Sequence, residues 1–571
     1  MLKKFAAVAL CVAFLCGSAM AQDAKTVIAN AQKALGDLKS ITYSGTAKDV
    51  AFQQCGISAA DLVCRGTHDP MRPITNYVRV IDLTAPTSRH TGGTNNPAGG
   101  GATTPAPGNF FQQVSPQQAD LAQPWAGALE LYITPWGFLR GAAASPNTFA
   151  SRRRLDGKNY VVLSWKPAVK APSGNDYVIN GYVNEQNIVD RVETWLGDNI
   201  MGDMHILATY TGWKDFGGVM APAKIVQTRG GWPFFEVEVT AAKANPPDVA
   251  TLAPQPAGGG RGGGGGGGAP AGAPGGAPAG GGGGARGGQG GGAPGGAPAG
   301  GAGAGAPAAA GAQGGPPRGG QGGAAVPPAP GGAQAPGGAP AAAGGARGGG
   351  GAALTVTPEK LGDGLYRFTT GGGSYDSLIV EFRDHIMMLE AGQNEARALA
   401  YIAETKKMFP NKPIRYVMNT HPHADHTGGL PAMIAEGATI ITHKNNEEFF
   451  EKALNTPRTL LNDTLAKSPK KAKVESVGDK RVYTDGTRVV EFYHVPTAPH
   501  SNGLLVAYIP KEKILFQGDF SLPAAGQPAN DHVKALVPVL EKLNLDFDRY
   551  INVHASATPQ TKAELWKAVG K

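Results

Sequence analysis

A block rich in glycine, proline and alanine constrains the fold of this 571-residue chain more than any other feature. The block spans residues 257–351 and contains more than half of the 85 glycines in the sequence. It has no aromatic residue and no strict Gly-X-Y repeat, which excludes a collagen helix. A segment with so little apolar surface to bury cannot offset the entropy lost on ordering. The sequence therefore predicts a disordered linker at 257–351.

Two longer pieces flank this linker, 22–256 and 352–571. Each has the length of an ordinary domain with its own hydrophobic core, so we expect two domains. The four cysteines are too few for a disulfide-rich scaffold. Mixed helical and strand-like patterns in both pieces indicate the α+β class.

The first 21 residues have the pattern of a cleavable signal peptide. Lys3 and Lys4 precede an apolar run of about 12 residues, and the small residues Ala19 and Ala21 predict cleavage before Gln22. The run is shorter than the ~20 residues that a membrane-spanning helix needs, although an uncleaved anchor is the alternative. We expect a periplasmic or secreted protein with no transmembrane segment after cleavage. In that oxidising compartment, Cys55 and Cys64 are expected to form a disulfide, with two free thiols as the alternative.

The net charge of +8 does not indicate nucleic-acid binding. Lys3 and Lys4 lie in the leader, and four arginines lie in the linker without balancing acids. Without these six charges, the two longer pieces carry a net charge of only +2. A DNA- or RNA-binding domain concentrates basic residues on a folded face, so no nucleic-acid partner is predicted.

The N-terminal piece has the pattern of a mainly antiparallel β domain with one helix. Apolar residues recur at helical spacing from Ala24 to Leu38, and several later runs alternate apolar and polar residues. The expected strands are Leu129–Thr134, Tyr160–Trp165, Tyr177–Val183, Ile188–Leu196, His205–Tyr210, Ala223–Thr228 and Phe234–Thr240. This pattern resembles the curved sheet around a helix in periplasmic lipoprotein-carrier domains. The resemblance implies a binding module with a lipid-like ligand.

The C-terminal piece contains a dense group of potential metal ligands. A buried strand, Tyr416–Thr420, leads directly into the sequence HPHADHTGG, which starts at His421. In an extended turn, alternate residues point the same way, so His421 and His423 are expected to face one ion. Asp425 and His426 are then expected to face a neighbouring position. Imidazole and carboxylate together suit a borderline divalent cation such as zinc.

This motif is similar to the signature of the metallo-β-lactamase fold superfamily, and later parts of the chain supply the family's other motifs in order. His500 precedes the strand Leu504–Ile509, Asp519 ends the strand Ile514–Asp519, and His554 ends a strand that starts at Ile551. The resemblance covers about residues 354–571 and implies an αβ/βα sandwich of two mixed sheets between helices. The helices expected in it are Asn394–Lys407, Gly429–Ala435, Asn446–Leu454, His532–Leu543 and Gln560–Val569.

The resemblance also implies a ligand set for two Zn²⁺ ions, with iron or manganese as alternatives. His421, His423 and His500 correspond to the ligands of the first metal. Asp425, His426 and His554 correspond to those of the second metal, and Asp519 corresponds to the bridging carboxylate. Asp425 is additionally expected to act in catalysis by orienting the attacking hydroxide. Glu390 stands where the family often has an Asp-Thr-Gly-like element, which implies a supporting role behind the ligands.

The implied function is that of a hydrolase in which a hydroxide shared by two metals attacks a small-molecule ester, thioester, lactone, sulfate, phosphoester or amide. A β-lactamase is one alternative, although the most common β-lactamases have a Cys where Asp519 stands. A carrier of a lipid-like ligand with a vestigial metal site is another. Four further histidines are not assigned as ligands. His385, His494 and His532 are expected to be structural or surface residues, while His443 lines the cleft or lies at the surface.

Overall fold

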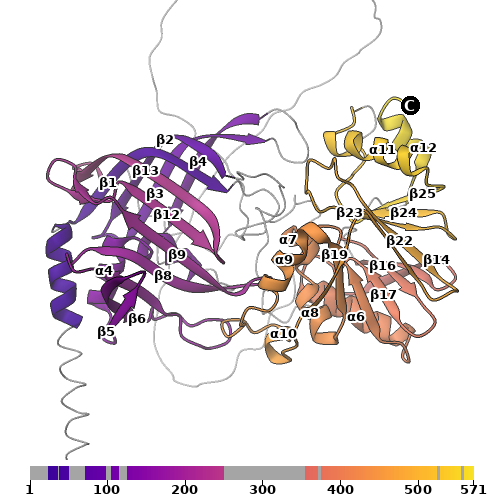
Figure 1. Cartoon of the computed structure of the whole chain (residues 1–571), viewed down its shortest axis with the longest axis horizontal. Helices are drawn as coiled ribbons and strands as arrows, with labels where there is room; N and C mark the ends of the chain where they lie inside the picture. The colour runs from indigo at the N-terminus through magenta and orange to yellow at the C-terminus, as the bar shows by residue number, and fades with distance from the viewer. Residues whose placement is uncertain are drawn as a thin grey trace, which may run out of the picture. The chain divides into compact units, whose positions relative to one another are not determined.

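A computed structural model describes residues 24–36, 38–50, 71–97, 105–114, 125–249, 354–370, 375–523, 527–554 and 559–571 (Figure 1). The expected signal peptide, Cys55, Cys64 and the expected linker lie outside these residues. Their assignments, and the domain boundaries at 22, 257 and 352, therefore stay predictions.

The N-terminal part forms one 11-stranded sheet in the order β4-β3-β2-β1-β13-β12-β9-β8-β7-β6-β5. Neighbouring strands are antiparallel. The strands are β1 (Ser40–Val50), β2 (Met71–Asp82), β3 (Thr87–Pro97), β4 (Pro105–Val114), β5 (Phe149–Leu155), β6 (Lys158–Trp165), β7 (Ile179–Val183), β8 (Val189–Asp198), β9 (Gly202–Thr211), β12 (Lys224–Arg229) and β13 (Trp232–Ala244). A short pair, β10 (Lys214–Asp215) and β11 (Met220–Ala221), lies outside the sheet.

The alternation in the sequence comes from a sheet with one buried face. In β9, Met204, Ile206, Ala208 and Tyr210 are buried, and the residues between them are half-buried. Residues 24–35 are helical and bury Ala24, Ile28, Ala31 and Leu35, which are among the apolar positions of the expected helix. The N-terminal part thus contains the expected antiparallel sheet and the expected helix.

One expected strand is wrong. Leu129–Thr134 lies not in the sheet but in α3 (Ala126–Tyr132) and in the turn before α4 (Pro135–Ala144). The Thr134 side chain accepts a hydrogen bond from Gly137 N, and Pro135 occupies the first turn, so the sequence here starts a helix. The six-residue alternation was too short to distinguish a strand from an amphipathic helix.

The buried side chain of Glu130 in α3 forms ion pairs with two arginines. Its carboxylate lies 3.1 Å from Nη2 of Arg229 and 3.9 Å from Nη1 of Arg79. All three side chains are buried, and a buried charge is stable only when it is paired. Tertiary pairing therefore orients α3, which a local sequence pattern does not show.

The C-terminal part contains two mixed sheets. The seven-stranded sheet contains β14 (Val356–Gly362), β15 (Leu365–Thr370), β16 (Ser377–Glu381), β17 (Ile386–Leu389), β18 (Ile414–Met418), β19 (Thr439–His443) and β20 (Lys473–Val477) in that order. The six-stranded sheet contains β21 (Lys480–Thr484), β22 (Val489–His494), β23 (Leu505–Ile509), β24 (Ile514–Gln517), β25 (Arg549–Asn552) and β26 (Gln560–Thr561). Strands β17, β18, β19 and β20 run parallel to one another, as do β24 and β25, and the other pairs in these two sheets are antiparallel.

Alternate residues of these strands enter different cores. Met387 and Leu389 of β17 pack between the two sheets together with Leu505 and Ala507 of β23. Met388 faces a second core instead, which also contains Tyr401 of α6 (Glu395–Met408) and Met433 of α8 (Leu430–Glu436). The opposite face of the six-stranded sheet packs against α11 (Asp531–Leu543) and Leu565 of α12 (Lys562–Ala568). This layering confirms the expected αβ/βα sandwich.

The expected helices of this part are confirmed with shifts of no more than two residues at their ends. Short polar residues before α6, α11 and α12 explain where these helices start, since Asn394, Asn530 and Thr561 each accept a backbone hydrogen bond from the first turn. α9 (Lys444–Ala453) follows β19, and α10 (Thr464–Lys467) is a single turn. No helix within the described ranges combines the length and the apolarity that a membrane crossing requires.

Candidate metal centre

The HPHADHTGG segment forms a tight connection between β18 and α8. His421 and His423 lie in the turn after β18, and Asp425 and His426 lie on the short helix α7 (Ala424–Thr427). A Cβ at Gly429 would lie 2.2 Å from the carbonyl oxygen of Ala391, so only glycine fits there without a backbone shift. The glycines of the motif thus let the next helix pack closely against the chain after β17.

The three residues that lie far from this segment in the sequence also lie in connections that follow strands. His500 lies between β22 and β23, Asp519 follows β24, and His554 follows β25. The structure brings all seven residues together in two groups whose ligand atoms each lie within 4.8 Å of one another. His421, His423, His500 and Asp519 form the first group, and Asp425, His426 and His554 form the second.

Asp519 lies between the two groups and offers one oxygen to each. Its Oδ2 is 2.6 Å from Nε2 of His500 and 3.6 Å from Nε2 of His421. Its Oδ1 is 2.8 Å from Nε2 of His426 and 2.7 Å from Nε2 of His554. A carboxylate in this position can bridge two cations.

The buried polar atoms of the cluster fit a cation better than they fit one another. His423 Nδ1, Asp425 Oδ1 and both Asp519 oxygens are buried without a hydrogen bond of ordinary geometry among the described residues. Nε2 of His500 lies 3.1 Å from Nε2 of His421, and the same atoms of His426 and His554 are 3.2 Å apart. Ligand atoms held ~2 Å from one tetrahedral zinc have a similar spacing. Metal binding would satisfy these otherwise unpaired groups.

Burial and neighbouring charges favour the deprotonated, metal-binding states of His421, His423 and Asp519. Burial, followed by the neighbouring histidines, holds the pKa values of His421 and His423 well below their usual range. Both rings therefore keep a free lone pair. Burial alone would raise the pKa of Asp519, but His426, His554 and His500 outweigh it and hold this pKa well below the usual value. The carboxylate is therefore ionised.

Protons on two groups would compete with metal binding. Burial lowers the pKa of His426, but the carboxylates of Asp519, Asp425 and Glu390 outweigh burial and raise this pKa well above its usual value. Burial, with a contribution from Asp519, raises the pKa of Asp425. A bound cation would displace these protons, since metal ligands bind in their deprotonated forms.

Glu390 supports the cluster from behind. Its Oε1 accepts a hydrogen bond from Thr420 N at 2.7 Å, and its Oε2 lies 3.3 Å from Nδ1 of His426. A proton on Nδ1 leaves Nε2 of His426 free to face the metal position. Glu390 has a φ of 73°, a left-handed conformation that is uncommon for a residue other than glycine. The expected supporting role thus has a geometric basis at a strained position.

The remaining histidines differ in how close they lie to the cluster. His385 stacks on Phe382 with ring centroids 4.6 Å apart, which agrees with a structural role. His532 lies closer to the cluster than a purely structural role implies, with its ring centroid 4.7 Å from that of His500.

His443 is buried and stacks on His494 at 3.7 Å between centroids, so the surface alternative for His443 is wrong. His494 Nε2 donates to the carbonyl oxygen of Asn502, in the loop that carries His500.

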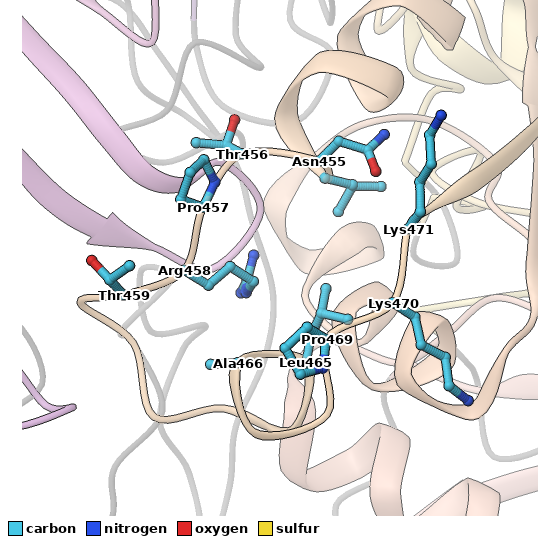
Figure 2. A pocket seen from close by; sticks show the side chains of 11 residues that line it. Asn455, Thr456, Pro457, Arg458, Thr459, Leu465, Ala466, Pro469, Lys470 and Lys471 are labelled. Carbon is cyan, nitrogen blue, oxygen red and sulfur yellow. The ribbon is translucent and has the colours of Figure 1, made fainter.

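A cavity of about 590 Å³ lies elsewhere in the C-terminal part. Figure 2 shows the side chains of residues 456–459 on one side of this cavity and those of Lys470 and Lys471 on the other. Arg458, one of the lining residues, pairs with Asp463. None of the seven clustered residues lines this cavity, so the candidate site rests on the ligand geometry.

The family model for the metallo-beta-lactamase superfamily matches residues 370–554. This segment contains all seven clustered residues in their expected order. Residues 370–554 belong to the metallo-beta-lactamase superfamily. Members of this family usually bind metal ions and act on small molecules, and the His and Asp groups described above could hold a metal.

The chain is also similar to individual proteins, each over part of its length. The chain is 24% identical over 213 residues to the 2,4-dinitroanisole O-demethylase subunit alpha of Nocardioides sp. (strain JS1661), and the match spans 35% of the chain and 60% of that relative. A metallo-beta-lactamase from Pontibacter korlensis is 18% identical, with a TM-score of 0.29, over 38% of the chain and 98% of that structure. The DIM-1 metallo-beta-lactamase is 17% identical, with a TM-score of 0.30, over 38% of the chain and 97% of that structure.

Proposed function

We propose that this protein is an exported metal-dependent hydrolase with a dinuclear zinc centre. The observation that carries the proposal is the position of Asp519 between the two groups, with Oδ2 toward His500 and Oδ1 toward His426 and His554. Seven nitrogen and oxygen ligands in two adjacent sets suit two borderline divalent cations. Iron or manganese are the alternative metals.

Two bound cations would supply a water acidic enough to act as a nucleophile near neutral pH and a Lewis acid for the substrate's electrophilic group. The residues of the chain would hold and orient this centre. Thr420 Oγ1 lies 3.0 Å from Nδ1 of His421, and Glu390 lies behind Nδ1 of His426, so both imidazoles can direct Nε2 inward. Asp425 Oδ1 is buried without a partner among the described residues, which suits the orienting role that we assign to this carboxylate.

The ligand set does not choose among ester, thioester, lactone, sulfate, phosphoester and amide substrates. Asp519 stands where common β-lactamases have a Cys, which favours the broader hydrolases. A panel of these electrophiles tests the proposal with purified protein that carries two equivalents of zinc. We add 2,4-dinitroanisole to the panel because one relative is named for that compound.

The decisive variant is Asp519→Asn, because it keeps the size of the side chain and removes its charge. We expect the variant to lose activity by at least about a hundredfold, given that losing a single charge-stabilising group in an active site costs ~10²–10³ in kcat. Asp384→Asn is the matched control, since this exposed aspartate pairs with Arg415 outside the cluster. No turnover of any panel member by the zinc-loaded wild type would contradict the hydrolase proposal.

β-Lactam hydrolysis is the second candidate function, supported by the family match. Turnover of nitrocefin by the zinc-loaded protein, lost in His421→Ala, would favour it over the broader panel. Intact enzyme that does not turn over nitrocefin would remove it.

The proposal of export rests on the pattern of residues 1–21. It predicts a mature protein in the periplasm or medium that starts at Gln22, which N-terminal sequencing would measure. A lipid-like ligand on the N-terminal sheet is a separate proposal. Native mass spectrometry that detects co-purified lipid but no metal would favour a carrier with a vestigial metal site.

A further inference from the structure

Tyr375 lies beside the candidate metal centre in a strained backbone conformation. Its φ is 65°, in the left-handed region that a bulky residue rarely adopts. Such outliers cluster at active sites, where the surrounding structure holds them in place. Tyr375 belongs to none of the motifs that marked the metal site in the sequence.

Two hydrogen bonds hold the peptide group that joins Tyr375 to Asp376. Tyr401 Oη donates to the carbonyl oxygen of Tyr375 at 2.9 Å, from the helix α6. The next residue, Asp376, donates its backbone N–H to the carbonyl oxygen of Val553, also at 2.9 Å. Val553 directly precedes His554. The strained residue is therefore tied to the strand end that carries a candidate metal ligand.

The ring of Tyr375 contacts two side chains near the candidate metal centre. It meets the His554 imidazole at 4.9 Å between centroids and an interplanar angle of 71°. The guanidinium carbon of Arg397 lies 5.2 Å from the ring centroid, within the range of a cation–π contact. These contacts fix the direction of the phenol before any ligand binds.

None of these contacts involves the hydroxyl group of Tyr375. Within the part of the chain that the structure describes, no hydrogen-bond partner of Tyr375 Oη is found, although the residue is half-buried. A phenylalanine would give the same ring contacts with His554 and Arg397. A half-buried hydroxyl without a protein partner beside a polar centre is suited to bind an oxygen atom of a ligand.

We propose that Tyr375 is a substrate-binding residue that donates its phenolic hydrogen to an oxygen atom of the substrate on the His554 side of the centre. The inference rests on the proposed hydrolase function and deepens it, because it assigns a residue that recognises the acyl, phosphoryl or sulfuryl oxygen. Arg397 and Tyr401 act as positioning residues for Tyr375. The hydroxyl is protonated near neutral pH, as a donor must be.

The test compares Tyr375→Phe with the wild type, both loaded with zinc. Tyr416→Phe is the matched control, because Tyr416 packs against the same core and contacts His385 and Tyr483 instead of the cluster. We expect the zinc content to be unchanged. For the best panel substrate, kcat/KM should fall by about tenfold in Tyr375→Phe and by less than twofold in Tyr416→Phe, since one hydrogen bond is lost.

Inorganic phosphate serves as a probe that does not require turnover. Titration calorimetry on the zinc-loaded proteins should give a Kd for phosphate that is about five- to tenfold weaker in Tyr375→Phe than in the wild type and in Tyr416→Phe. Equal phosphate affinities in all three proteins, with unchanged zinc content, would overturn the proposal and leave Tyr375 as a packing residue. If the wild type hydrolysed no panel member, the hydrolase proposal would fail while the phosphate result still decided the role of Tyr375.

Discussion

Replacing Glu390 by glutamine should weaken one of the two metal positions and leave the other intact. The carboxylate serves two groups at once, with Oε1 2.7 Å from Thr420 N and Oε2 3.3 Å from Nδ1 of His426. Both neighbours donate hydrogen bonds in the metal-binding state. Glutamine has only one acceptor oxygen, so one of these two donors must lose its partner.

The direction of the effect follows from the tautomer of His426. If the amide oxygen keeps Thr420 N, the NH₂ group faces Nδ1 of His426 and favours the tautomer with its hydrogen on Nε2. That hydrogen would point at Asp519 and block the lone pair that a cation needs. If the amide flips, Thr420 N loses its acceptor in a buried site.

The expected magnitude comes from the cost of an unpaired buried group, roughly 1–3 kcal/mol, which corresponds to about 5- to 150-fold in affinity. Loss of an outer hydrogen-bond partner typically costs 10- to 100-fold in metal affinity. We therefore expect one zinc equivalent to bind as in the wild type and the other to bind about 10- to 100-fold more weakly. The assay is zinc titration against a chelating dye.

Glu395→Gln is the control, because Glu395 accepts a backbone hydrogen bond from Thr464 without facing a histidine. It should bind two zinc equivalents with wild-type affinity. The reasoning about His426 would be refuted if Glu390→Gln bound both zinc equivalents with wild-type affinity, or if it bound both equally more weakly.

Three further predictions concern stability. Gly429→Ala should lower the free energy of unfolding by about 1–3 kcal/mol in urea, because the new Cβ would meet the carbonyl oxygen of Ala391, whereas Gly478→Ala, with no atom within 4 Å, should unfold like the wild type. Burial, followed by His494, lowers the pKa of His443 to about 4, so the unfolded chain takes up a proton that the folded chain excludes as pH falls from 6.5 to 4. The wild type should therefore lose stability over that window by roughly 1–3 kcal/mol more than His443→Gln, and equal slopes in denaturation series would contradict this. Chelation of a metal present at about a thousand times its Kd should remove about 4 kcal/mol of stability and lower Tm in calorimetry, while an unchanged Tm would mean that the folded state binds no metal.

The residues of the cluster were predictable because they lie in the segments that connect strands, in a fixed order along the chain. One predicted strand leads directly into His421, and another ends near Asp519. Such local contexts can be recognised in a sequence. The tertiary meeting of these strand ends came from the family resemblance rather than from spacing. The positions on helices α6, α8 and α11 were predictable from helical periodicity and from capping residues such as Asn394 and Asn530.

Features that depend on contacts between residues far apart in the chain could not be predicted from the sequence. The alternation in Leu129–Thr134 predicts a strand, whereas the structure has a helix there. The orientation of this helix depends on the pairing of Glu130 with Arg79 and Arg229, 51 and 99 residues away along the chain. The stacking of His443 on His494 joins two strands of different sheets. Tyr375 left no signal, since its left-handed backbone and its contact with His554 exist only in the folded chain.

The most direct test of the dinuclear centre is a crystal structure of the zinc-loaded protein with data collected at the zinc absorption edge. We predict two anomalous peaks ~3.5–4 Å apart. One should lie among His421, His423 and His500, the other among Asp425, His426 and His554, with Asp519 between them. A single peak, or peaks that lie away from these residues, would contradict the account.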